Sequence, residues 1–249
     1  MNNKQYVTSE VEFFTEDKLD AMDLQARADK LQQTEVKRLI KFLNAVRQLT
    51  AAEYKELTYN DVDIRFRADE ALRVLGRSMD TDYEPVLAQF FGFDQDNELV
   101  GLAFHYLAMQ WRRPLPYADQ IRHYVWGGEF DPARHASYNA IRAAGEYLAQ
   151  TNCQDRQLLK KLLLIATAST PDEFEIGFFD DEQVLGPDIE KEVPYGTVPI
   201  ECAVQALYRA SSGKRWDFMT PREKHVDIPD PDVLFDKIRK ILASPVETT

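Results

Sequence analysis

Four polar side chains with catalytic chemistry fall on one face of a helix that the sequence predicts after Pro132. His135, Asn139, Arg142 and Glu146 are spaced at i, i+4, i+7 and i+11, which places them in one stripe along that helix. A histidine and a glutamate can transfer protons, and an arginine beside them can bind a phosphate group. The stripe is therefore the first candidate for an active site, and its alternative interpretation is a polar face turned to water.

The motifs that usually accompany phosphate, acyl and metal chemistry are absent from the sequence. It contains no G-x-x-x-x-G-K-[ST], no G-x-G-x-x-G and no G-x-S-x-G, and neither Cys153 nor Cys202 has a catalytic flanking signature. His123, His135 and Glu129 lack the fixed spacing of a metal-binding motif. We therefore predict no metal site and no cofactor.

A second group of residues is suited to binding. The segment from Trp111 to Arg142 has five arginines against three acidic residues, although the formal charge of the whole chain is −12. Arginine and tryptophan dominate interface hot spots and also stack on bases. The alternative is that the arginine stems cover aromatic edges of the core. The binding candidates in this segment are Trp111, Arg112, Arg113 and Trp126.

The third candidate is an acidic and aromatic segment between residues 170 and 196. Nine acidic residues and one lysine lie between Pro171 and Glu192, together with several aromatic residues. Charges accelerate association, while a buried aromatic side chain holds the complex, so this composition predicts a contact surface for a protein with a basic face. A packed lid with solvated acids is the alternative. The predicted contact residues are Glu175, Phe178, Phe179, Asp180, Asp181 and Glu182.

The elements that must position these residues are predicted to be helices. Proline directly follows a capping residue at four places, as in Asp230-Pro231, and this pair is typical of a helix start. Apolar residues recur at steps of three and four, for example at Val36, Leu39, Leu43 and Val46. We expect an all-α multi-helix globular domain of about eight to ten helices. Two segments with a period of two, 7–13 and 174–178, could pair as a small two-stranded β ribbon.

The predicted organisation is a single helical domain over residues 1–249. The acidic-aromatic segment 170–196 interrupts it as an insertion, and a C-terminal helical part, 197–249, packs back on the body because it is too small to hold a core of its own. The longest uncharged apolar run, from Leu99 to Trp111, is too short to span a bilayer. It is expected to form a buried helix, with His105 as a core histidine.

Composition narrows the function further. The net charge of −12 disfavours binding to nucleic acid or to an anionic membrane. Two cysteines without a pairing pattern, and a start without a signal-peptide pattern, indicate a cytoplasmic protein. The leading hypothesis is a non-catalytic acidic intracellular protein that docks on another macromolecule, as an inhibitor, immunity protein, phage-type accessory factor or assembly adaptor. The alternative is a small all-α enzyme for a phosphorylated or nucleotide substrate.

Overall fold

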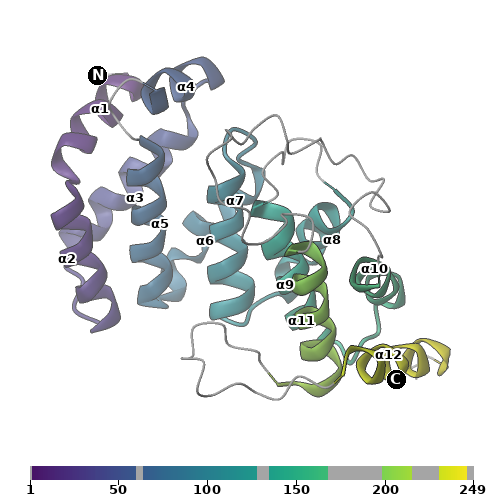
Figure 1. Cartoon of the computed structure of the whole chain (residues 1–249). Coiled ribbons are helices and arrows are strands. Elements are labelled where there is room, and N and C mark those ends of the chain that lie inside the picture. The colour runs from purple at the N-terminus through teal and green to yellow at the C-terminus, as the bar shows by residue number, and fades with distance from the viewer. Residues whose placement is uncertain (1, 60–63, 128–134, 168–197, 215–229, 246–249) are drawn as a thin grey trace. The chain divides into compact units, whose positions relative to one another are not determined.

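The computed structural model describes residues 2–59, 64–127, 135–167, 198–214 and 230–245 (Figure 1). Every regular element in these ranges is helical, and no strand occurs in them. The all-α prediction is confirmed, although the twelve α-helices of the described ranges exceed the expected eight to ten. The chain divides into two compact units, Met1–Trp111 and Arg112–Thr249.

The ribbon expected at residues 7–13 is wrong, because these residues lie in helix α1 (Asn3–Phe13). Val7, Glu10 and Phe14 are buried, which is the three-then-four spacing of a helix face. The side chain of Asn2 caps the helix by accepting a hydrogen bond from the Gln5 amide at 2.9 Å. Residues four apart, such as Val7 and Val11, share a face both in a strand and in a helix, so the pattern in the sequence was ambiguous. The other predicted strand, 174–178, lies outside the described residues.

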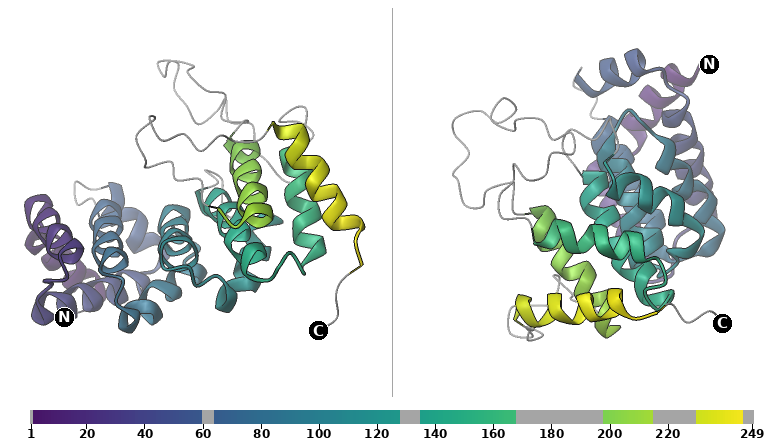
Figure 2. Two further views of the ribbon diagram at one scale, coloured as in Figure 1. Left: turned by 90° about the horizontal axis from the view of Figure 1, so that it is seen from below. Right: turned by 90° about the vertical axis from the view of Figure 1, so that its right-hand side faces the viewer.

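The first unit is built from two layers of stacked helices (Figure 2). One layer contains α2, α5 and α7, and the other contains α1, α3 and α6; α3 and α5 connect the layers by direct packing. The elements that follow α1 in this unit are α2 (Glu16–Arg27), α3 (Gln33–Arg47), α4 (Ala51–Tyr59), α5 (Ile64–Ser78), the 3-10 helix η1 (Thr81–Tyr83), α6 (Glu84–Ala88), the 3-10 helix η2 (Gln89–Gly92), α7 (Asn97–Ala103) and the π-helix η3 (Phe104–Gln110).

The second unit is organised around α9. This helix packs against α8, α10 and α11, while α12 packs against α10 and α11. None of the described helices of either unit has the length and apolar character needed to cross a bilayer. The elements of the second unit are the 3-10 helix η4 (Leu115–Tyr117), α8 (Ala118–Val125), α9 (His135–Gln150), α10 (Arg156–Ala166), α11 (Val198–Ser212) and α12 (Pro231–Ala243).

One of the four predicted helix starts can be compared with the structure. Helix α12 begins at Pro231, and the Asp230 carboxylate accepts a hydrogen bond from the Asp232 amide at 3.0 Å. The Asp230-Pro231 prediction is therefore confirmed. The other three predicted capping residues lie outside the described residues.

The apolar run of the first unit changes helix type in its middle. It continues from α7 into η3, and the Trp111 amide donates to the Tyr106 carbonyl, a step of five residues, at 2.8 Å. In this segment Tyr106 is buried, whereas His105 is exposed, so the expectation of a core histidine at position 105 is wrong.

Gly76 of α5 receives the Tyr106 ring. A Cβ atom added at Gly76 would lie 2.2 Å from the ring carbon Cγ of Tyr106, far inside van der Waals contact. The indole nitrogen of Trp111 donates a hydrogen bond to the Gly76 carbonyl at 2.6 Å. The π-helix thus brings two aromatic side chains onto one residue of α5, and glycine is required there because no side chain fits.

Gly76→Ala should destabilise the protein by roughly 1–3 kcal/mol, because the new methyl group overlaps the Tyr106 ring. This sign is the opposite of the usual result inside a helix, where replacing glycine with alanine stabilises by about 1 kcal/mol. Chemical denaturation measures the difference in the free energy of unfolding.

Gly92→Ala is the matched control, since no atom lies within 4 Å of its added Cβ. Its free energy of unfolding should stay within about 0.5 kcal/mol of the parent value, or increase. Equal stabilisation of both variants would contradict the packing of Tyr106 on Gly76.

Candidate functional site

The structure separates the four residues of the predicted catalytic stripe. His135, the first residue of α9, is exposed, and its carbonyl accepts a hydrogen bond from Asn139 Nδ2 at 3.0 Å. Arg142 is half-buried, and its Nε donates to Gln205 Oε1 on α11 at 3.4 Å. Glu146 is buried and also faces α11. The stripe therefore runs from the protein surface into a helix–helix interface.

Glu146 makes an ion pair in that interface. Its Oε2 accepts a hydrogen bond from Arg209 Nη2 of α11 at 2.9 Å, and the two side chains are only 5% and 17% exposed. Two charges buried this far lose most of their hydration, so each depends on the other for compensation. The contact fixes the position of α9 along α11, which is a structural role.

The cysteines are buried thiols. Burial raises the pKa of Cys202 on α11 to about 11, although the nearby Arg142 acts in the opposite direction. Burial also raises the pKa of Cys153. A raised pKa disfavours the thiolate, which is the nucleophilic form. Neither thiol is therefore activated for covalent chemistry at neutral pH.

The four predicted binding residues of the Arg/Trp segment have different environments. Trp111 is buried in the first unit, where it bonds to Gly76. Arg112 and Arg113 are exposed, and the Arg112 carbonyl accepts a hydrogen bond from Gln150 Nε2 at 2.9 Å. Trp126 follows α8 and is 40% exposed. Three of these four side chains are thus exposed in the second unit.

The acidic contact residues predicted between Glu175 and Glu182 all lie outside the described residues. The structure consequently places none of the six, and their role stays a prediction.

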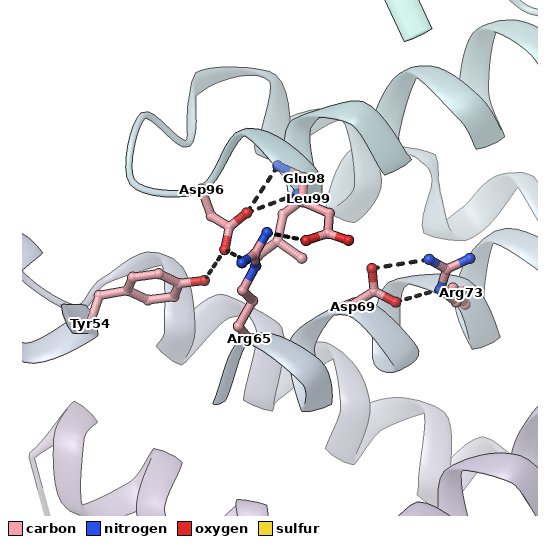
Figure 3. Close-up of polar contacts among 7 residues, drawn as sticks. All are labelled: Tyr54, Arg65, Asp69, Arg73, Asp96, Glu98 and Leu99. Atoms are coloured by element: carbon pink, nitrogen blue, oxygen red, sulfur yellow. Dashed lines mark hydrogen bonds and ion pairs between the residues drawn. The ribbon is translucent and has the colours of Figure 1, made fainter. Parts of the chain in front are cut away.

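A polar cluster in the first unit was not predicted from the sequence (Figure 3). Asp96 caps α7, because its Oδ1 accepts from the amides of Glu98 at 2.9 Å and Leu99 at 3.4 Å. Its Oδ2 accepts from the Tyr54 hydroxyl at 2.6 Å and lies 3.1 Å from Arg65 Nε. Arg65 also pairs with Glu98. The signal in the sequence was the aspartate before α7, but its partners come from helices α4 and α5.

This cluster has the residue types of an active site, but the oxygens of Asp96 are not free to contact a substrate. Both oxygens of Asp96 are occupied by donors from the protein. Burial disfavours the charge of Arg65, yet the neighbouring carboxylates of Asp96 and Glu98 outweigh it and raise the arginine pKa. Asp69 and Arg73 form a separate pair along α5, with Arg73 Nη2 at 3.2 Å from Asp69 Oδ2 (Figure 3). The contacts of Asp96 and Arg65 join α4, α5 and α7.

Within the described residues, no group of three or more histidine, cysteine, aspartate or glutamate side chains is arranged to hold a metal ion.

The chain matches no protein-family model, no curated protein and no solved structure.

Glu146→Gln should lower the free energy of unfolding by roughly 3 kcal/mol, because it leaves the charge of Arg209 buried without its counter-ion. Thermal or chemical denaturation of the purified variant measures this loss.

Asp236→Asn is the control for that experiment. Asp236 forms an ion pair with Arg239 at 2.8 Å, close to the 2.9 Å of Glu146 and Arg209, but both of its side chains are exposed. Its removal should cost less than about 1 kcal/mol. Similar small losses in both variants would show that the Glu146–Arg209 contact does not hold α9 against α11.

Proposed function

We propose that the protein is a non-catalytic binding protein that docks on another macromolecule. One observation carries this proposal: apart from the exposed His135, the polar side chains best suited to chemistry are engaged in helix packing. Glu146 is paired with Arg209, Arg142 with Gln205, and Asp96 with Tyr54 and Arg65. A general base or acid must reach a substrate proton, which a group held between two helices does not do.

The proposed partner is a protein with a basic surface, and the proposed contact segment is 175–182. Its carboxylates would accelerate the encounter, and Phe178 or Phe179 would supply the apolar anchor that charge alone does not provide. Inhibition, immunity, accessory and adaptor roles all use such a contact. The exposed side chains of Arg112, Arg113 and Trp126 are candidates for a second contact.

We further propose that the protein acts in a reducing compartment such as the cytoplasm. Cys153 and Cys202 are both buried and unpaired with each other. Unpaired thiols are common where glutathione and thioredoxin keep cysteines reduced.

The partner is to be captured with the tagged full-length protein from its native host and identified by mass spectrometry. Binding kinetics with that partner then test the contact segment. Replacing Asp180, Asp181 and Glu182 with Asn, Asn and Gln should slow association and flatten its dependence on ionic strength, since the screening length is about 8 Å at physiological salt. Phe179→Ala should instead speed dissociation, by a factor that corresponds to roughly 2 kcal/mol or more.

A control variant removes the same number of charges from exposed positions of the first unit. It should leave the dissociation rate unchanged and slow association less than the changes in segment 175–182 do. Unfolding by Phe179→Ala, together with binding that ignores the three charge changes, would contradict the proposal and identify the segment as a packed lid. The control substitutions are Glu12→Gln, Asp17→Asn and Asp20→Asn.

A further inference from the structure

The second unit has a groove lined by residues of α10 and α12, two helices that pack against each other. Its volume is about 580 Å³. Three basic side chains line it, Arg156 and Lys160 from α10 and Arg239 from α12. Among the described residues, no acidic side chain lines this groove. The charged side chains in its lining are therefore all positive, in a chain whose formal charge is −12.

The basic character extends over both helices. Together α10 and α12 contain six lysine or arginine residues and two aspartates. Lys160 is exposed and has no ion-pair partner in the described part of the chain, and Arg239 is paired only with the exposed Asp236. These charges are thus available to a ligand, whereas Arg209 and Arg142 are already engaged with α9 or α11.

Arg156 Nε is one of nine buried side-chain atoms of the described residues that lack a hydrogen-bond partner. The Nη1 of this arginine donates a hydrogen bond to the Ile241 carbonyl at 2.6 Å, which positions the guanidinium between the two helices. Its Nε is buried and has no acceptor within the described residues. A buried donor without a partner is unfavourable, and an acceptor supplied by a bound group would remove that cost.

The groove is also partly apolar. Leu163, Leu164 and Leu242 line it, and Leu164 is 58% exposed. A single exposed leucine is ordinary, but here three leucines share one hollow with three basic side chains. Recognition sites of this kind take a large apolar side chain between polar contacts. The matching ligand has carboxylates and at least one apolar anchor.

We propose that this groove binds an acidic segment of a partner protein, with a large apolar side chain among its carboxylates. Charge complementarity supports this occupant, and a hollow between two helices suits an inserted segment. A lipid surface is the poorer match because it is flat, whereas the groove is a hollow between two helices. This surface has the opposite charge to segment 175–182, so the inference goes beyond the proposed function and does not rest on it.

Fluorescence anisotropy with the full-length protein tests the groove. The probe is a labelled peptide, DEFEIGFFDDE, which has the sequence of residues 172–182 and the required acidic and aromatic composition. The reference peptide, NQFQIGFFNNQ, keeps the apolar residues and removes the charges. The acidic peptide should bind at least about tenfold more tightly than the reference, because close charge pairs across an interface contribute at least that factor.

Two variants of the protein locate the binding site. Lys160→Glu should weaken binding of the acidic peptide at least about tenfold by reversing a charge of the groove. Leu164→Asp should do the same by placing a carboxylate on the apolar wall. Both residues are exposed, so the fold should persist, which circular dichroism verifies. Lys30→Glu, an equal charge reversal at an exposed position of the first unit, should leave binding unchanged.

Three results would overturn the inference. The first is binding of the acidic peptide that is no tighter than the reference or is insensitive to Lys160→Glu. The second is Lys160-dependent binding to vesicles of phosphatidylcholine and phosphatidylserine without binding of the peptide, which would assign the surface to a membrane. The third is tighter peptide binding when Asp180, Asp181 and Glu182 of the protein are neutralised, which would show that the chain's own acidic segment occupies the groove.

Discussion

Helix packing in this protein depends on close approach at a glycine. In the second unit a Cβ atom at Gly145 of α9 would lie 2.6 Å from the Ala206 Cα of α11, so the two helices meet almost backbone to backbone. Arg142 and Glu146 flank Gly145 on α9, and Gln205 and Arg209 flank Ala206 on α11. The polar contacts between these helices lie beside the close approach. In the first unit Gly76 also permits a close approach, but the neighbouring group is the ring of Tyr106 and not a helix backbone.

Close approach also explains why the predicted catalytic stripe does not lie on one exposed face of α9. A stripe of four polar residues on α9 faces water only if nothing covers that side of the helix. Helix α11 covers its C-terminal half, so Arg142 and Glu146 serve packing while His135 remains exposed. Burial then determines which of the polar side chains can still reach a ligand. The buried carboxylates of Asp96 and Glu146 take part in helix packing. Lys160 and Arg239 in the groove of α10 and α12 remain exposed.

The sequence was sufficient to predict helices because helix signals are local. A capping residue and its proline, as at Asp230-Pro231, act within one turn, and apolar steps of three and four identify a buried face. The same signals failed where a pattern had two solutions, as at Val7 and Val11, and where the helix type changed, as at His105. They could not identify Arg209 as the partner of Glu146, 63 residues away, because that contact depends on which helices pack together. The sequence did not reveal the groove for the same reason. Its leucines look like core residues unless it is known that α12 packs against α10.

The two proposed surfaces should respond differently to salt, because the net charge acts on them with opposite sign. A chain with a formal charge of −12 attracts a basic partner at long range, and salt removes that attraction. The same net charge repels an acidic segment at long range, while Lys160, Arg156 and Arg239 attract it only within the groove. Salt therefore weakens both the distant repulsion and the local attraction, and these effects oppose each other. Binding in the groove should consequently depend less on ionic strength than binding of a basic partner, even though both contacts are made by charged residues.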